Sequence, residues 1–385
     1  MKRWMAALLT LGLLLTGCAR TLPQETTDPA AAPPPTKPTE AGEIAAEPTT
    51  APGTEPTEPE LEPGGRVKIL GREVPAYRTG SEDPGDLVSL SDFADAAGVS
   101  LEVRQGIVYG DGVELSAVTA LTRRDGAYAP APELGAALGL ERYVDEEENV
   151  TYFYERSATN KLPEGVYVPI LMYHAVGDDL WGTPELFVST GDLEDQFRYL
   201  VDNGYTPIFF SDLGRVTEFQ KPVILSFDDG YDDNYGELFP LVQKYGVKVN
   251  IAVITGYIGG KHSLKEDEIR EMWDSGLVSF LSHTVSHPFL TELGQEELEE
   301  ELERSRLALL RLTGTMPTVL VYPNGDNNEG VREAAARYYD MGVIMTDGRC
   351  YVTGNNPYTV SRDYVSRYTT LEEFACMISW AGMTE

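Results

Sequence analysis

Short apolar runs of strand length alternate with amphipathic helical stretches from about Ser157 to the end of the chain. The runs are Val168–Tyr173, Tyr205–Phe210, Val223–Phe227, Val247–Ile254, Leu277–Ser282, Thr318–Tyr322, Gly342–Thr346 and Thr359–Val365. Helices are expected between them, as at Asp192–Asn203, Tyr235–Tyr245 and Gln295–Leu312. Repeated strand–helix units favour a parallel sheet, so residues 159–385 are expected to form an α/β domain, a distorted (β/α) barrel.

A different pattern covers residues 66–156, where Leu87–Gly98 aligns with Tyr128–Gly139 at an offset of 41. Each copy is typical of a strand that enters an amphipathic helix ending at Gly, followed by β-rich sequence. The pattern predicts a small α+β repeat domain, and it resembles the copper amine oxidase N-terminal-like domain. No cluster of metal ligands occurs in it, so we expect a non-catalytic stalk that is either a spacer or a wall-binding module.

The first residues have the pattern of an export signal. Lys2 and Arg3 precede an apolar run, Trp4–Leu15, that is too short for a stable membrane span. Leu15–Cys18 resembles the bacterial lipobox, which implies that residues 1–18 are a lipoprotein signal peptide with lipidation at Cys18. The protein would then be exported and anchored by lipid alone to the outer face of the cytoplasmic membrane. An ordinary signal peptide with an incidental Cys is the alternative.

Residues 19–65 separate this signal from the repeat. Thr21–Gly65 holds 11 Pro and 9 Thr with no aromatic residue, so it has too little apolar surface to offset the entropy of ordering. We expect a disordered Pro/Thr/Glu linker.

The charge of the chain excludes one class of partner. With 62 acidic against 30 basic residues, the net charge is −32, which argues against binding of nucleic acid. Three cysteines are too few for a disulfide scaffold or a cysteine zinc module.

Polar residues follow several of the predicted strands. His174 follows the first, Asp228-Asp229-Gly230 the third, and His283 with His287 the fifth, while Tyr322–Gly325 closes the sixth. Because the carboxyl ends of parallel strands meet on one rim, we expect these side chains to converge.

The residue types at this rim suit metal-assisted hydrolysis. Two imidazoles four residues apart and one carboxylate make a metal site with open positions, as catalytic zinc requires. Adjacent aspartates after a strand point apart, so one can bind metal while the other accepts a proton from the attacking water. Taken singly, the Asp pair would be interpreted as a capped turn and the histidines as ordinary core or surface residues.

The same residues carry a family resemblance. Ser226–Gly230 and His283–Pro288 resemble the first two motifs of the polysaccharide deacetylases, carbohydrate esterase family 4, and Tyr322–Gly325 is similar to the third. The resemblance implies that Asp228 is the general base. It implies that Asp229, His283 and His287 hold a divalent metal, usually Zn²⁺. A backbone N–H near Asn324 would help to stabilise the oxyanion, with Tyr322 beside it in the substrate pocket.

Two departures from the family pattern affect the expected roles. Val321 stands where most members have an Arg, and Asn324 where an aromatic residue is common. Arg362, in the last expected strand, is the candidate replacement that tunes the base, with a structural salt bridge as the alternative.

The usual late His is missing, but Pro169–His174 resembles the opening motif of a subgroup that acts on poly-N-acetylglucosamine. That resemblance makes His174 the candidate general acid, with a structural His as the alternative.

The resulting expectation is a metal-dependent hydrolase that acts on carbon–nitrogen bonds other than peptide bonds. Its partner would be an N-acetylated polysaccharide of the cell wall or the extracellular matrix, of the peptidoglycan or poly-N-acetylglucosamine type. The alternatives are an O-acetyl ester deacetylase and a catalytically impaired wall-binding lipoprotein. We assign no partner to the fourth histidine, His262.

Overall fold

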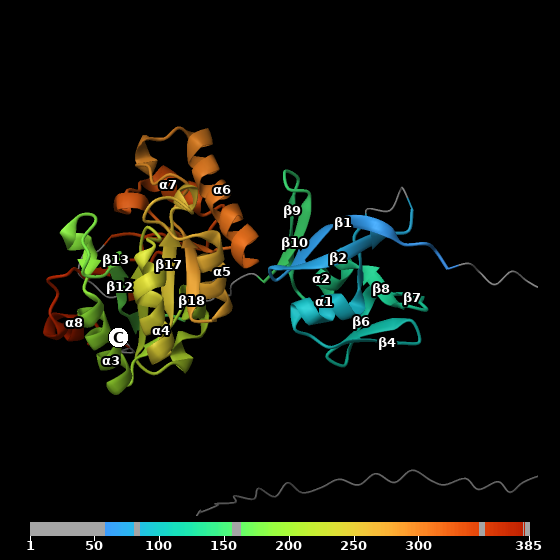
Figure 1. Ribbon diagram of the computed structural model, residues 1–385, viewed down its shortest axis with the longest axis horizontal. Helices are drawn as coiled ribbons and strands as arrows, with labels where there is room; N and C mark the ends of the chain where they lie inside the picture. The colour runs from blue at the N-terminus through green and yellow to red at the C-terminus, as the bar shows by residue number, and fades with distance from the viewer. Residues whose placement is uncertain (1–57, 81–84, 156–162, 346–350, 380, 382–385) are drawn as a thin grey trace, which may run out of the picture. The chain divides into compact units, whose positions relative to one another are not determined.

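The computed structural model describes residues 58–80, 85–155, 163–345, 351–379 and 381 of the 385-residue chain (Figure 1). The expected signal peptide with Cys18, most of the expected linker, and Cys350 lie outside the described residues. Among the residues that are described, no helix is both long enough and apolar enough to cross a membrane.

Residues 58–80 and 85–155 form a seven-stranded sheet in the order β7-β8-β3-β2-β1-β10-β9 and a separate three-stranded sheet, β4-β5-β6. The strands of the larger sheet are β1 (Glu62–Ile69), β2 (Arg72–Arg78), β3 (Leu87–Ser89), β7 (Leu121–Arg123), β8 (Gly126–Pro130), β9 (Glu141–Asp145) and β10 (Val150–Tyr154). The smaller sheet contains β4 (Leu101–Arg104), β5 (Ile107–Gly110) and β6 (Val113–Thr119). Phe93, Leu134 and Phe153 are buried in the core of this part.

Two short helices, α1 (Leu90–Ala97) and α2 (Ala131–Ala137), each follow directly on a strand. The strands concerned, β3 and β8, are antiparallel neighbours, with Val88 opposite Ala129. Ser89 caps α1 through the N–H of Asp92, and the left-handed Gly98 ends it. The two aligned stretches of sequence therefore lie side by side in one sheet.

Ordered structure begins earlier than the composition predicts. Strand β1 starts at Glu62, inside the segment expected to be unfolded, and pairs Glu62 with Arg78 and Pro63 with Tyr77. Backbone pairing with a neighbouring strand needs no apolar side chain, so an argument from composition misses it.

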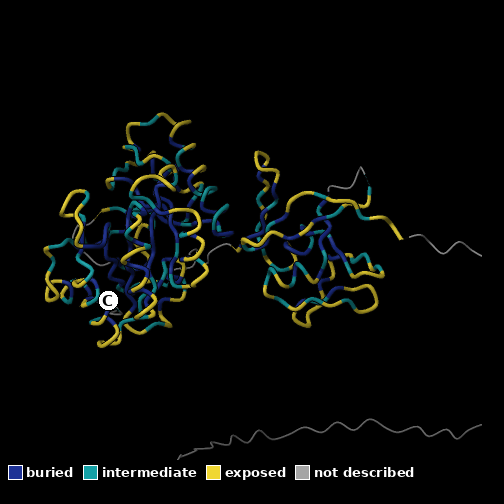
Figure 2. Tube along the Cα trace, in the orientation of Figure 1, coloured by how far each residue is buried: buried dark blue, intermediate teal, exposed yellow. Residues whose placement is uncertain are grey.

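Residues 163–345 and 351–379 contain a curled parallel sheet, which confirms the expected α/β class. The strand order is β20-β19-β18-β17-β16-β12-β22, with β15 also beside β16. These strands are β12 (Ile170–Tyr173), β15 (Thr206–Pro207), β16 (Pro222–Phe227), β17 (Val249–Val253), β18 (Val278–Ser282), β19 (Val319–Val321), β20 (Met341–Val343) and β22 (Asp363–Tyr364). Every residue of β12, β16, β17 and β19 is buried, and these strands form part of the dark blue interior in Figure 2.

Helices lie outside the strands (Figure 1). They are α3 (Thr190–Asp202), α4 (Phe239–Tyr245), α5 (Glu266–Asp274), α6 (Gln295–Thr313), α7 (Glu329–Ala335) and α8 (Leu371–Met377). Helix α6 buries Leu298, Leu302 and Leu309 on one face, as the spacing predicts. The left-handed Gly314 then ends this helix.

The last expected strand, Thr359–Val365, is divided between the two edges of the curled sheet. Val360 bridges in parallel to Val343 at the end of β20, whereas β22 pairs with β12. Arg362 lies between these two contacts, and its Nε–H donates to the carbonyl of Ile344. The chain thus brings the Arg362 side chain to the rim where β12 and β16 end.

One expected strand is largely absent. Of Tyr205–Phe210, only Thr206 and Pro207 pair with β16, and a 3-10 segment, η2 (Phe210–Glu218), follows. The carboxylate of Asp212 accepts the backbone N–H of Phe209 and stabilises the start of this segment. The apolar run is therefore buried without forming a strand beyond Pro207.

Candidate active site

A pocket of about 330 Å³ lies at the carboxyl ends of the parallel strands. Its lining consists of Met172, His174, Leu186, Asp228, Asp229, His283, His287, Tyr322, Asn324, Met345, Arg362 and Tyr364. It brings together all of the catalytic, metal and substrate residues that the sequence indicates. The pocket also contains four lining residues that the sequence analysis does not assign to the site: Met172, Leu186, Met345 and Tyr364. The sequence could have indicated Tyr364, because it lies two residues after Arg362 and alternate residues of a strand share a face.

Three of these side chains form a compact set of metal ligands. Ligand atoms of Asp229, His283 and His287 all lie within 4.8 Å of one another. Oδ1 of Asp229 is 3.4 Å from Nε2 of His283 and 3.7 Å from Nε2 of His287. The Nδ1–H of His283 donates to the carbonyl of Val321 at 2.7 Å, so Nε2 is the nitrogen that faces Asp229 and can bind a metal once it has lost its proton. Two imidazoles and one carboxylate suit a divalent metal such as zinc, with positions left open for water and substrate.

The backbone adopts unfavourable conformations to place these ligands. Asp229, Thr284 and His287 have φ angles of 75°, 65° and 59°, a region that costs non-glycine residues about 1 to 3 kcal/mol each. A hydrogen bond from the N–H of His287 to Oγ1 of Thr284 at 3.1 Å supports the turn between the two histidines. Such strain persists only where the surroundings enforce it, as they do at functional sites.

The ligands interact strongly before any metal binds. Burial alone would raise the pKa of Asp229, but the hydrogen bond and charge of His283, together with the charge of His174, hold that pKa well below its usual range. Burial opposes charge on His283 too, yet Asp229 and Asp228 raise its pKa overall. The pKa of His287 is lowered, chiefly by burial. A metal ion would compete with a proton between Asp229 and His283, so metal binding is expected to release a proton.

The candidate base, Asp228, is bound on both oxygens by Arg362. Nη1 and Nη2 of Arg362 donate to Oδ1 and Oδ2 of Asp228 at 2.7 and 2.8 Å. Nη1 also donates to the hydroxyl of Ser226 at 2.9 Å, and that hydroxyl is 3.4 Å from Oδ1 of Asp228. Burial would raise the pKa of Asp228, but the charge and hydrogen bonds of Arg362 keep it below the ordinary value. The carboxylate is therefore ionised at neutral pH and can accept a proton.

The candidate acid, His174, lies across the pocket at the end of β12. Its ring meets the ring of Tyr364 edge-on, with 5.8 Å between centroids, and Nδ1 is buried with no hydrogen-bond partner among the residues that the structure describes. Burial lowers the pKa of His174, although Asp228 and Asp229 oppose that effect. The side-chain amide of Asn234 donates to the carbonyl of His174 at 3.1 Å and so stabilises the backbone at this residue.

Asn324 and Tyr322 line the pocket in different ways. Asn324 has φ = 57° within a short 3-10 turn, η6 (Pro323–Gly325), which redirects the chain at the rim. The Tyr322 side chain is only 1% exposed, and its hydroxyl donates to the carbonyl of Tyr358 at 3.3 Å. Tyr322 therefore contributes a wall to the pocket, while its hydroxyl is bound elsewhere.

The fourth histidine, His262, lies outside this pocket but has a partner. Its ring stacks on Trp181 with 4.3 Å between centroids and 4° between planes. Nδ1 of His262 is 3.9 Å from Asp232. The sequence alone provided no signal for this contact, because the two stacked residues come from distant loops.

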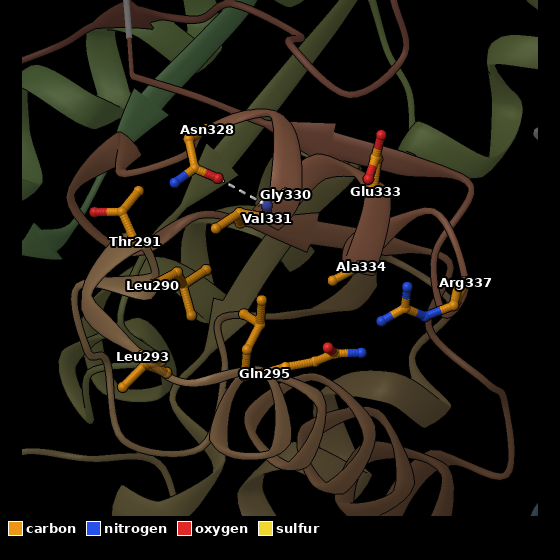
Figure 3. A pocket seen from close by; sticks show the side chains of 11 residues that line it. Leu290, Thr291, Leu293, Gln295, Asn328, Gly330, Val331, Glu333, Ala334 and Arg337 are labelled. Carbon is orange, nitrogen blue, oxygen red and sulfur yellow. Dashed lines mark hydrogen bonds between the residues drawn. The ribbon is translucent and has the colours of Figure 1, made fainter.

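A second pocket, of about 350 Å³, lies between η5 (Leu290–Glu292), the start of α6, and α7 (Figure 3). Leu290, Leu293 and Val331 contribute apolar side chains to it. Figure 3 shows Asn328 turned toward the first turn of α7, where its Oδ1 accepts the N–H of Val331 at 2.9 Å. None of the residues that the sequence indicates for catalysis lines this pocket, so the site is assigned to the first.

Comparisons with known proteins indicate the family to which the chain belongs. The family model described as polysaccharide deacetylase matches residues 215–341. YxkH of Bacillus subtilis (strain 168), named as a polysaccharide deacetylase, is 34% identical over 200 residues, covering 50% of this chain and 70% of YxkH. The crystal structure of BC0361, a polysaccharide deacetylase from Bacillus cereus, is similar with a TM-score of 0.53 and 27% identity, covering 68% of this chain and 76% of BC0361.

A third relative is named for its substrate. The poly-beta-1,6-N-acetyl-D-glucosamine N-deacetylase of Escherichia coli (strain K12) is 25% identical over 264 residues, or 56% of this chain. The chain spans 39% of the length of that enzyme. Together the matches define a deacetylase of polysaccharides. The chain belongs to the polysaccharide deacetylase family.

Proposed function

We propose that the protein is a metal-dependent deacetylase that removes N-acetyl groups from an amino-sugar polymer of the cell wall or extracellular matrix, with poly-N-acetylglucosamine as the first candidate. The observation that carries the proposal is the meeting of Asp228, the Asp229–His283–His287 set and His174 in one pocket. The similarity to the E. coli enzyme supports the choice of polymer.

Asp229, His283 and His287 would hold the metal, with zinc as the expected ion. When bound, the metal polarises the acetyl carbonyl and acidifies a water molecule. Asp228 takes the proton from the attacking water, and its bonds to Arg362 hold the carboxylate in the orientation for that transfer. Oδ1 of Asp228 accepts from both Arg362 and Ser226, whereas Oδ2 accepts from Arg362 and keeps a second lone pair that can take the proton.

Breaking the carbon–nitrogen bond requires a proton on the departing amine. His174 is placed to supply it, from the strand next to the one that bears Asp228. A backbone N–H near Asn324 would donate to the oxyanion that forms on the acetyl carbonyl. These three protein groups divide proton removal, proton delivery and charge stabilisation among different elements of the sheet.

Ester deacetylation is the second candidate function, and the environment of His174 favours it. Burial lowers the pKa of His174, so the free protein carries less of the protonated acid. An alkoxide can leave the tetrahedral intermediate unprotonated more readily than an amide anion can, because an alcohol is a much stronger acid than the N–H of an amine. Ester cleavage therefore depends less on a general acid than amide cleavage does. The complete Asp–His–His set argues against the third expectation, a catalytically impaired binding protein.

Attachment by a lipid at Cys18 remains part of the proposal, as does zinc. Mass spectrometry of the membrane fraction would detect a diacylglycerol-modified Cys18 at the mature amino terminus. An unmodified terminus at another residue would contradict the anchor.

The function is tested by acetate release from a panel of substrates: β-1,6-linked and β-1,4-linked N-acetylglucosamine oligomers, peptidoglycan and acetylated xylan. We expect release from an N-acetylated substrate, and loss of that release in Asp228→Asn. Release from xylan alone would support the esterase. Tight zinc binding without release from any substrate would contradict the enzymatic function.

A further inference from the structure

Two of the three residues between the two metal-ligating histidines are bound by a carboxylate outside the pocket. Oε2 of Glu301, on α6, accepts the backbone N–H groups of Val285 at 2.8 Å and of Ser286 at 3.0 Å. Oε1 accepts the hydroxyl of Ser286 at 2.6 Å. Glu301 does not line the active-site pocket, so any effect on the reaction must pass through this loop.

The opposite side of the same loop is held by the segment after β17. The N–H of Thr255 donates to the carbonyl of Thr284 at 3.1 Å, and the N–H of Gly256 to that of Val285 at 2.8 Å. A Cβ at Gly256 would lie 2.6 Å from the carbonyl oxygen of Val285, so the approach requires glycine. The loop carbonyls are thus bound from one side and its N–H groups from the other.

Helix α6 is itself fixed to the strand that leads into the loop. The hydroxyl of Ser305, one helical turn after Glu301 and on the same face, is 2.7 Å from the hydroxyl of Ser282, the last residue of β18. The phenol of Tyr339 donates to Ser282 as well, at 2.8 Å. Glu301 therefore lies on a helix that is hydrogen-bonded to the residue immediately before His283.

We propose that Glu301 is a positioning residue of the metal site: it holds the His283–His287 turn in its left-handed geometry and thereby sets the affinity for the metal. This inference rests on the proposed metal dependence. The positive φ angles of Thr284 and His287 mean that the turn would relax if its anchor were removed. Relaxation would separate the two imidazoles, and loss of such an outer partner typically weakens metal binding by about 10-fold to 100-fold.

The test compares zinc affinity, measured by competition with a chromophoric chelator, in the wild-type protein and three variants. Glu301→Ala removes all three bonds, and Glu301→Gln keeps an acceptor for the N–H groups without the charge. Glu303→Ala, an exposed glutamate two residues along the same helix, is the matched control. We expect about 10-fold to 100-fold weaker zinc binding in Glu301→Ala, an intermediate loss in Glu301→Gln, and no change in the control.

A second readout separates positioning from a general loss of fold. Excess zinc should restore most of the turnover of Glu301→Ala, whereas it should restore none in Asp228→Asn. Unchanged zinc affinity in both Glu301 variants, beside a wild-type protein that binds zinc tightly, would overturn the role of Glu301 and leave the proposed function standing. A wild-type protein that binds no zinc would overturn both.

Discussion

Arg362 and Asp228 lie 134 residues apart in the sequence and form an ion pair with two hydrogen bonds. Both residues are buried, with exposed fractions of 1% for Arg362 and 3% for Asp228. An unpaired buried charge would be strongly unfavourable, so each residue compensates the charge of the other. The pair also orients the base toward the pocket. Its position follows from the division of the last strand segment between β20 and β12.

Replacing Arg362 with Gln is predicted to shift the pH profile and to weaken the fold. Without the guanidinium, burial raises the pKa of Asp228, so the ionised base is lost at higher pH and the acidic limb of kcat/KM moves upward. Leaving the carboxylate buried and unpaired should cost about 3 to 5 kcal/mol of the free energy of unfolding. Arg362→Lys keeps the charge and should shift less. An acidic limb at the wild-type position in Arg362→Gln would contradict the role of the pair.

Asp228→Asn and Asp229→Asn are predicted to fail for different reasons. Asp228 lies outside the ligand set, so its variant should bind zinc normally while kcat falls by about 100-fold to 10,000-fold. Asp229→Asn should bind zinc more weakly, and its turnover should fall because less zinc is bound. Calorimetric zinc titration beside turnover distinguishes the two, and thermal unfolding controls for the Arg362 charge left unpaired in Asp228→Asn. Equal loss of zinc by both variants would show that the assignment of the two aspartates is wrong.

His174→Gln is predicted to discriminate between amide and ester substrates. If His174 protonates the departing amine, kcat for an N-acetyl substrate should fall by about 100-fold or more, and kcat for an O-acetyl ester by much less. Both rates are measured on the same preparation with paired substrates. An equal loss on both would mean that His174 only shapes the pocket.

The strands and motifs of the catalytic half could be predicted because they are local. Apolar runs bounded by polar residues predicted β16, β17 and β18 to within two residues at each end, and the rule that active sites follow strands brought His174, Asp228 and His283 together. The run at Tyr205–Phe210 has the same composition, yet it forms only two strand residues because a capped 3-10 segment competes for it.

Contacts between distant loops gave no comparable signal. The stacking of Trp181 on His262 and the hydrogen bond from Val285 to Glu301 depend on how elements pack. Trp181, His262 and Glu301 lie outside the motifs that the sequence offers. Two tyrosines near this rim also differ in a way that packing decides, since Tyr322 lines the pocket and Tyr173 does not. Tyr173 is fully buried, stacks on Phe227 and donates to Gln196.

A buried carboxylate beside the site predicts a pH-dependent stability. Oδ1 of Asp233 accepts the backbone N–H of Val176 at 3.1 Å and the side-chain amide of Asn234 at 2.9 Å. Burial raises the pKa of Asp233 from 3.8 to about 7. Because the folded state prefers the protonated form, this contribution is present below about pH 4 and is lost as the pH rises to about 7.

Asp233→Asn mimics the protonated form and tests this directly. Above about pH 7 the variant should be more stable than the wild type, by on the order of 4 kcal/mol, and the difference should vanish near pH 4. Denaturant unfolding of both proteins at a series of pH values gives the difference. Parallel stability curves would contradict a raised pKa at this position.

The most direct test of the account is a zinc titration of the metal-free protein in which bound zinc and acetate release are measured in the same samples. The account predicts that turnover of an N-acetylglucosamine oligomer rises in proportion to bound zinc and saturates at one ion per chain, and that His287→Ala neither binds zinc tightly nor turns over. Full turnover in the metal-free protein, or in His287→Ala, would contradict it.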